Sequence, residues 1–214
     1  MSYSNGPKIL TDGLVLCWDI SNPKSYPGTG TTVYDLCGNY NGTLVNGPTF
    51  STANGGVIVF DGLDDYLYNS AINYSSGTST VMGAARYSGA TRGRMINGYN
   101  NNWLVGHWNS SVANYYAQNW ISSVGAGGSD TTWRIYAATG NTVADSWGLY
   151  INGNINVSNN GGSQGPNGIA VGKIGYSNSE YSTGEFSFLM VYNRVLSANE
   201  ILQNHNALKG RFLL

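Results

Sequence analysis

The C-terminal part of the chain, residues 185–208, places the tightest constraint on the fold. It begins with a continuous apolar run over residues 186–192, which is typical of a buried strand. A short helix is then expected over residues 197–209. Ser197 and Glu200 have the spacing of a capping box, in which each side chain accepts a hydrogen bond from an otherwise unpaired backbone N–H. The segment therefore predicts a strand that leads directly into a helix with a well-defined start.

The predicted helix needs the rest of the chain for its stability, because an isolated helix of this length is barely stable in water. Ile201, Leu202 and Leu208 are expected to form its apolar face, and Gly210 is expected to end it. Arg194 lies in the turn before the helix, where its guanidinium can bond carbonyl groups or an acid at the strand–helix junction. We therefore expect the helix to pack on a body formed by the preceding residues.

That body is predicted to be all-β, because short strand-like runs alternate with turns rich in glycine and asparagine along the whole chain. The Asn46-Gly47 and Asn152-Gly153 dipeptides are typical of two-residue hairpin turns. Only 10% of the residues are charged, whereas glycine and tyrosine are frequent, as in proteins built from short strands and tight turns. We predict a jelly-roll β-sandwich of two antiparallel sheets with one short C-terminal helix. It would form a single domain over residues 1–214, with an N-terminal arm over residues 1–12.

Charge and hydropathy argue against several kinds of partner. The formal net charge is −1 and no basic run occurs, so a groove for nucleic acid is not expected. No apolar run approaches the ~20 residues of a membrane-spanning helix. The N-terminus lacks the apolar segment of a secretory signal, so synthesis in the cytoplasm without a signal peptide is expected.

Cys17 and Cys37 lack a metal-binding spacing, and whether they form a disulfide stays open.

The acidic residues do not form a recognisable catalytic pattern. Glycoside hydrolysis needs two carboxyl groups ~5 to 9.5 Å apart, one protonated and one ionised. The three glutamates, Glu180, Glu185 and Glu200, do not alternate along one strand as such a pair would require. His107 and His205 have no G-x-S-x-G partner with which to build a serine triad. The sequence therefore predicts a protein that is not an enzyme.

Three aspartates close together offer a candidate cation site. Asp61, Asp64 and Asp65 could supply carboxylate oxygens to Ca²⁺. The same residues also suit a tight turn, in which aspartate side chains accept hydrogen bonds from nearby backbone and Gly62 adopts a positive φ. We favour the turn. No other cofactor is expected.

Several segments together resemble one family of domains. The most specific are residues 60–66 (FDGLDDY) and residues 191–201 (VYNRVLSANEI), supported by residues 13–19, 22–26 and 34–44. In this order and spacing they resemble the concanavalin A-like, laminin-G-like jelly-roll domain, in the version found in bacteriophage virion proteins. The resemblance covers nearly the whole chain, and it implies a concanavalin A-like sandwich.

The resemblance also implies a non-enzymatic structural protein on the surface of the virion. The partners would be other virion proteins, namely the major capsid protein or tail components, and a trimer is one possible assembly. Because the sequence lacks the heptads of a trimerising shaft, a capsid decoration or head-fibre role with some glycan adhesion is favoured. The alternative is a host-recognition lectin on the tail that binds a surface glycan. A polysaccharide hydrolase is the third hypothesis.

A region rich in aromatic and amide side chains supplies the candidate contact residues. Sugars stack on aromatic rings while amides bond their hydroxyl groups. On a strand over residues 114–123, every second side chain would share one face. The same residues could instead fill the core or pack against capsid proteins, and that interpretation is favoured. The candidates for glycan or protein contact are Trp103, His107, Trp108, Tyr116 and Trp120.

Overall fold

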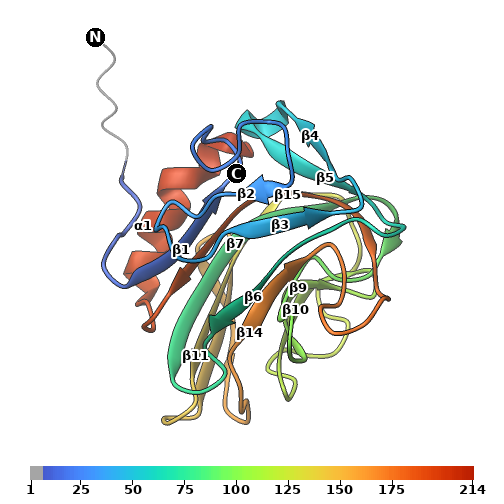
Figure 1. Ribbon diagram of the computed structural model, residues 1–214. Coiled ribbons are helices and arrows are strands. Elements are labelled where there is room, and N and C mark those ends of the chain that lie inside the picture. The colour runs from blue at the N-terminus through green and yellow to red at the C-terminus, as the bar shows by residue number, and fades with distance from the viewer. Residues whose placement is uncertain (1–6) are drawn as a thin grey trace.

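The protein is a β-sandwich in the computed structural model, which describes residues 7–214. The first six residues of the predicted arm, residues 1–12, lie outside the described part. Two antiparallel sheets, of eight and seven strands, pack face to face, and one helix follows the last strand (Figure 1). The prediction of an all-β sandwich of two antiparallel sheets with one short C-terminal helix is confirmed.

The eight-stranded sheet is centred on the two longest strands, β7 and β15. Its other strands flank this pair, and β1 (Leu14–Asp19) also pairs with β15 beside β5. The order across the sheet is β13 (Asn154–Asn159), β12 (Ser146–Ile151), β11 (Arg134–Asn141), β7 (Thr78–Arg92), β15 (Ser182–Tyr192), β5 (Val57–Asp61) and β4 (Thr49–Ser51).

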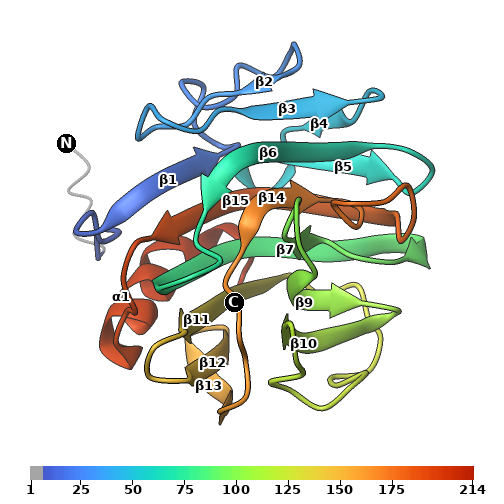
Figure 2. The same cartoon turned by 60° about the horizontal axis from the view of Figure 1, so that its bottom comes forward.

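The seven-stranded sheet forms the second layer, and its strands overlap those of the first in the turned view (Figure 2). A short 3₁₀ turn, η1 (Ala53–Gly55), precedes β5 in the other layer. The order across the second sheet is β10 (Ser111–Ala117), β9 (Trp103–Trp108), β8 (Ile96–Asn97), β14 (Asn167–Val171), β6 (Tyr66–Asn73), β3 (Gly42–Val45) and β2 (Thr32–Val33).

Large aromatic side chains fill the space between the sheets. Trp18 from β1 and Trp147 from β12 are buried there together with Tyr115 from β10. Burial of such apolar surface is the main favourable contribution to folding. The polar atoms of these rings find partners: Trp18 Nε1 donates to the carbonyl of Tyr40 at 2.9 Å, and the Tyr115 hydroxyl donates to that of Thr139 at 3.1 Å. The core is therefore apolar with its aromatic polar atoms largely hydrogen-bonded.

Helix α1 (Ala198–Leu208) covers the outer face of the eight-stranded sheet, where Ile201 and Leu208 pack in a second apolar cluster. Leu202 was predicted on the apolar face, but it is exposed. The reason is geometric, because Leu202 is turned about 100° from its neighbour Ile201 on a helix of 3.6 residues per turn. Gly210 does not end the helix directly: α1 ends at Leu208, and the 3₁₀ turn η2 (Lys209–Arg211) follows. Neither α1 nor the 3₁₀ turns within residues 7–214 could cross a membrane.

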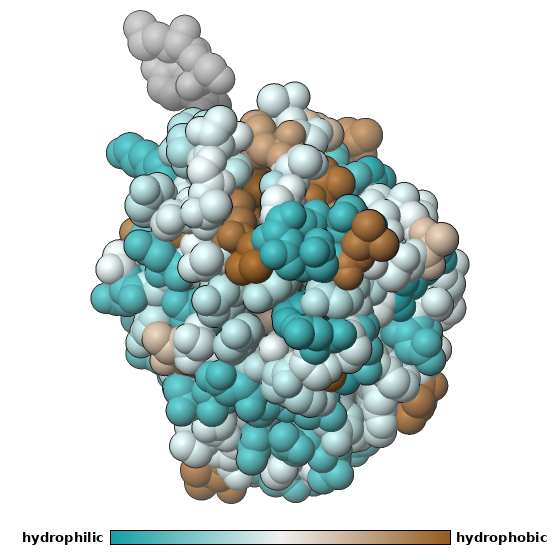
Figure 3. Space-filling model, turned by 45° about the vertical axis from the view of Figure 1, so that its right-hand side comes forward, coloured by the Kyte–Doolittle hydropathy of each residue, from teal (hydrophilic) through white to brown (hydrophobic). Residues whose placement is uncertain are grey.

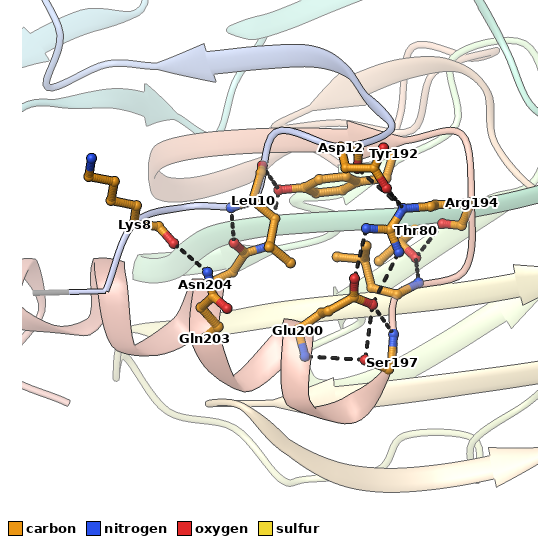
Figure 4. A network of polar contacts seen from close by, with 11 residues as sticks. Lys8, Leu10, Asp12, Thr80, Tyr192, Arg194, Ser197, Glu200, Gln203 and Asn204 are labelled. Carbon is orange, nitrogen blue, oxygen red and sulfur yellow. Dashed lines mark hydrogen bonds and ion pairs between the residues drawn. The ribbon is translucent and has the colours of Figure 1, made fainter.

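The junction between β15 and α1 contains the predicted capping box (Figure 4). The Ser197 N–H donates to Glu200 Oε2 at 2.8 Å, and the Glu200 N–H donates to the Ser197 hydroxyl. Arg194 Nη2 lies 2.8 Å from Glu200 Oε1, and Arg194 Nε lies 3.0 Å from an Asp12 carboxylate oxygen. Arg194 thus has the structural role predicted for it, joining the N-terminal arm to the start of the helix.

The arm itself is held against α1 and β15 (Figure 4). The Leu10 N–H donates to Asn204 Oδ1 at 2.8 Å, and the Tyr192 hydroxyl donates to the Leu10 carbonyl at 3.0 Å. Gln203 Nε2 donates to the Lys8 carbonyl at 2.9 Å. Because the partners lie far apart in sequence, these bonds tie the two ends of the described chain together.

The capping glutamate makes stability depend on pH. Hydrogen bonds from Arg194 and from the Ser197 backbone lower the pKa of Glu200 from 4.5 to about 2. Its contribution is therefore complete above pH 4.5 and is lost as the pH falls towards 2. We expect Glu200→Gln to lower the free energy of unfolding by less than about 1 kcal/mol at pH 7, because the pair is partly exposed. Urea unfolding at pH 7 and pH 2 tests this, and a difference of equal size at both pH values would contradict it.

Candidate functional site

Two of the five predicted contact residues lie in the core. Trp103 is 1% exposed and packs edge-on against Tyr115. His107 is fully buried between Tyr87 and Tyr136, with ring centres 4.5 and 5.2 Å away. Burial lowers the pKa of His107 to about 3, so its imidazole is neutral. β9 directs both side chains between the sheets, so Trp103 and His107 fill the core, which is the interpretation favoured from the sequence, and neither is accessible as the alternative ligand contact.

The other three predicted contact residues form one half-buried group, which we call the aromatic cluster: Trp108, Tyr116 and Trp120. The Trp120 ring centre lies 5.0 Å from that of Trp108 and 5.1 Å from that of Tyr116. The strand expected over residues 114–123 is shorter, because β10 ends at Ala117 and Gln118 adopts a positive φ of 63°. Trp120 therefore meets Tyr116 across a turn, through an isolated bridge, and not along one strand face.

A pocket of about 450 Å³ opens beside Trp108 at one rim of the sandwich. The ends of β7 and β9 and the segment before β15 converge there, and Gly62 of the β5–β6 turn also lines it. On the side of the molecule turned forward in Figure 3, hydrophilic and intermediate residues predominate and hydrophobic ones occur in small separate patches. We call this the rim pocket, and its main side chains are Thr91, Arg92, Trp108, Asn109, Glu180 and Tyr181.

Close backbone contacts shape the rim pocket. The Gly93 N–H donates to the Tyr181 carbonyl at 3.0 Å, and the Arg94 N–H donates to the Glu180 carbonyl at 2.9 Å. A Cβ atom at Gly93 would lie 2.0 Å from the Glu180 carbonyl oxygen, so only glycine permits this approach. Asn109 and Ser110 form the β9–β10 turn, both at positive φ. These features fix the walls before any ligand binds.

Two arginines and one glutamate supply the charges at the rim pocket. The Arg94 side chain is only 5% exposed, pairs with the Glu180 carboxylate and donates through Nη1 to Asn102 Oδ1 at 2.7 Å. Arg92 donates through Nε to the Gly89 carbonyl at 2.8 Å. Its guanidinium carbon lies 5.7 Å from the centre of the Tyr87 ring, within cation–π distance. The Arg94–Glu180 pair is neutral as a whole, whereas Arg92 has no acidic partner among the described residues. The pocket therefore presents aromatic surface and hydrogen-bonding groups beside one positive charge.

The three predicted calcium ligands lie on the β5–β6 turn next to Gly62. Carboxylate oxygens of Asp61, Asp64 and Asp65 lie within 4.8 Å of one another. Two of these groups already accept backbone hydrogen bonds, since Asp61 Oδ1 bonds the Leu63 N–H at 2.8 Å and Asp65 Oδ2 bonds the Asp61 N–H at 3.1 Å. Ca²⁺ takes six to eight oxygen ligands, so this trio would supply only part of its shell. Calcium binding stays a prediction.

The sequence did not identify Arg92, Glu180 and Tyr181 as neighbours of Trp108. They come from segments that are distant in the chain and meet only through the pairing of β7 with β15. The only sequence feature at this position is a glutamate followed by a tyrosine in a segment with few charged residues. This feature does not indicate which other residues lie beside the pair.

Comparisons with known proteins identify the fold but no family. No protein-family model matches the sequence, and no curated protein matches it either. Among solved structures, Trypanosoma rangeli sialidase with the inhibitor DANA is 14% identical, with a TM-score of 0.66. The match covers 96% of this chain and 34% of the sialidase, so the chain spans about a third of that protein.

Two further structures are similar over most of this chain. Domain 4 of an extracellular arabinanase from Geobacillus stearothermophilus, in complex with arabinotriose, is 15% identical with a TM-score of 0.69, covering 90% of this chain and 98% of that domain. The binding domain of Paraclostridial Mosquitocidal Protein 1 is 16% identical with a TM-score of 0.67, covering 91% of this chain and 52% of that one. At these identities, the likeness establishes a shared β-sandwich fold.

Proposed function

We propose that this chain is a non-catalytic carbohydrate-binding domain that binds oligosaccharides in the rim pocket. The observation that carries the proposal is the combination of Trp108 and Tyr181 with Thr91 and Asn109 around one pocket of about 450 Å³. Aromatic rings stack on the C–H faces of sugars, and amides and hydroxyls bond their hydroxyl groups. The volume is within the range of about 300–1,000 Å³ that small-molecule sites occupy.

The arrangement of the glutamates supports a binding role without catalysis. Each glutamate forms an ion pair with an arginine: Glu180 with Arg94, Glu185 with Arg86 and Glu200 with Arg194. A general acid for glycoside hydrolysis must hold a proton, whereas an adjacent guanidinium favours the ionised carboxylate. The three glutamates are therefore unsuited to act as the general acid, and we propose that the protein binds oligosaccharides without cleaving them.

The structural neighbours support the same proposal. One similar domain has arabinotriose bound, one belongs to a sialidase, and another is the binding domain of a mosquitocidal protein. Because the fold alone is shared, these names carry less weight than the residues of the rim pocket.

Display on a phage particle is the second part of the proposal, and the resemblance at residues 60–66 and 191–201 supports it. Attachment to the major capsid protein would make the chain a head decoration that adheres to glycans. Attachment to tail components would make it a host-recognition lectin. Immunogold electron microscopy of purified virions distinguishes the two, since label would lie over the head or at the tail tip. Virions without label would contradict display on the particle.

Trp108→Ala is expected to weaken oligosaccharide binding roughly tenfold, which corresponds to about 1.4 kcal/mol. The probes are four neutral trisaccharides, arabinotriose, maltotriose, cellotriose and chitotriose, which we call the trisaccharide panel. Binding is measured by isothermal titration calorimetry, and sugar release after long incubation is measured by chromatography. Tyr34→Ala removes an exposed aromatic ring outside the pocket and should bind as the wild type does. Equal affinity of Trp108→Ala and Tyr34→Ala would contradict the proposed site.

A further inference from the structure

We propose that a second hollow, on the outer face of the seven-stranded sheet, binds a further unit of the same oligosaccharide. This inference rests on the proposed function. The hollow has a volume of about 460 Å³ and lies outside every residue that the sequence suggested as a contact. We call it the tyrosine hollow, and the side chains that the argument uses are Tyr66, Tyr99, Asn100, Lys173, Tyr176 and Asn178.

The aromatic surface of the tyrosine hollow follows from the period of β6. Tyr66 and Tyr68 alternate with Leu67, whose side chain lies in the core, so both tyrosines face outward. Tyr99 stacks on Tyr68, with ring centres 4.6 Å apart and planes inclined by 20°. The exposed ring of Tyr176 stands on the loop opposite. Stacked, half-exposed tyrosines offer the flat apolar surface on which a sugar ring can lie.

A fully buried asparagine holds the loop that closes the hollow. Asn97 Nδ2 donates to the Lys173 carbonyl at 2.6 Å, and Asn97 Oδ1 accepts the Gly175 N–H at 3.0 Å. A Cβ atom at Gly175 would lie 2.2 Å from the Tyr99 Cα atom, so the loop lies directly against that residue. Because these bonds exist without a ligand, little ordering would be needed on binding.

The ammonium group of Lys173 is held by contacts within the protein. Its ammonium group donates to the Ser177 carbonyl at 3.2 Å and to Asn178 Oδ1 at 3.1 Å, and it lies 4.3 Å from the centre of the Tyr66 ring. These contacts hold the ammonium group in place, but two neutral acceptors and an aromatic ring do not neutralise its positive charge. Lys173 is also only 3% exposed. The hollow therefore combines tyrosine rings with one positive charge, a surface that suits a sugar ring and can also attract a carboxylate.

The remaining polar groups of the hollow are available to sugar hydroxyls. Within residues 7–214, the hydroxyl groups of Tyr66, Tyr99 and Tyr176 make no hydrogen bond to another residue. Asn100 Nδ2 donates to the Ser70 carbonyl at 2.9 Å, which leaves Asn100 Oδ1 free to accept. Hydroxyls that both donate and accept, beside an amide oxygen, match the alternating donors and acceptors of a sugar ring.

One side chain separates the tyrosine hollow from the rim pocket. The Lys173 ammonium lies 4.3 Å from the ring centre of Tyr66, in the hollow, and 5.8 Å from that of Tyr181, in the rim pocket. Two aromatic platforms on either side of one ammonium group can contact successive units of one chain. We therefore infer that the ligand is an oligosaccharide that spans both, so that trisaccharides bind more tightly than the corresponding monosaccharides.

The test compares variants of the two platforms by titration with the trisaccharide panel. Tyr99→Ala is expected to weaken binding roughly tenfold, and Tyr34→Ala is expected to leave it unchanged. Tyr176→Ala, at an exposed ring whose loss should not affect folding, is expected to weaken binding about threefold. Wild-type affinity of both Tyr99→Ala and Tyr176→Ala would overturn the inference.

The outcomes separate this inference from the proposed function. If Trp108→Ala weakens binding and the tyrosine variants do not, the rim pocket stands and the second hollow is rejected. If only the tyrosine variants weaken binding, the hollow stands and the rim pocket is rejected. If the wild-type protein binds no member of the panel, both fail.

Discussion

Asp35→Ala is expected to lower the free energy of unfolding by about 3 kcal/mol, one of the two largest losses expected for a single side chain. Asp35 is 6% exposed, and its carboxylate accepts four backbone hydrogen bonds. Oδ1 accepts the N–H groups of Cys17 at 2.7 Å and Cys37 at 3.0 Å, and Oδ2 accepts those of Asn39 and Tyr40, both at 3.0 Å. The substitution would leave these four donors without their acceptor.

The position of Asp35 explains why the effect should be global. Its carboxylate joins β1, in the eight-stranded sheet, to the turn that leads into β3, in the seven-stranded sheet. Urea unfolding followed by tryptophan fluorescence measures the loss. Asp35→Asn keeps one acceptor oxygen and should lose an intermediate amount. Asp12→Ala removes an aspartate whose side chain is 85% exposed, and its surface ion pair with Arg194 should contribute less than about 1 kcal/mol to the free energy of unfolding. A loss as small as this for Asp35→Ala would refute the account.

The ion pair behind the rim pocket should respond asymmetrically to substitution. Glu180→Ala is expected to cost about 3 kcal/mol, because it leaves the buried Arg94 guanidinium without its counter-charge. Arg94→Met is expected to cost about 1 kcal/mol, since the Glu180 side chain is 36% exposed and can be hydrated once released. Both variants should also weaken trisaccharide binding, because Glu180 and Tyr181 form one wall of the pocket.

Urea unfolding of the two variants and of Arg94→Met/Glu180→Ala measures the asymmetry. The double variant should be more stable than Glu180→Ala, because it removes the unpaired charge. A double variant that is less stable than Glu180→Ala would show that the arginine charge is not the source of the cost.

Local turn signals predicted backbone geometry better than strand pairing. Asn152-Gly153 joins β12 to β13 as a hairpin, as expected, with both residues at positive φ. Asn46-Gly47 also has positive φ at both residues, yet it joins β3 to β4, which lie in different sheets. A dipeptide determines the turn, whereas the strand that each neighbour pairs with depends on the burial of distant residues.

This dependence on distant residues also explains why only some of the predicted contact residues are exposed at the candidate site. Aromatic density identified Trp108, Tyr116 and Trp120, which do form a half-buried cluster, but it could not separate them from the buried Trp103 and His107. Exposure is set by strand register and by where a strand ends. The capping box was predictable because its residues are neighbours in sequence, whereas both pockets are assembled from segments brought together by sheet topology.

Nuclear magnetic resonance of the tryptophan indole N–H groups tests carbohydrate binding at the rim pocket most directly. The chain has six tryptophans, and Trp18, Trp103 and Trp147 are buried in the core. Addition of the trisaccharide panel to ¹⁵N-labelled protein should shift the Trp108 signal, assigned by its absence in Trp108→Ala, and leave those three unchanged. A Trp108 signal that stays in place at saturating sugar would contradict carbohydrate binding at this site.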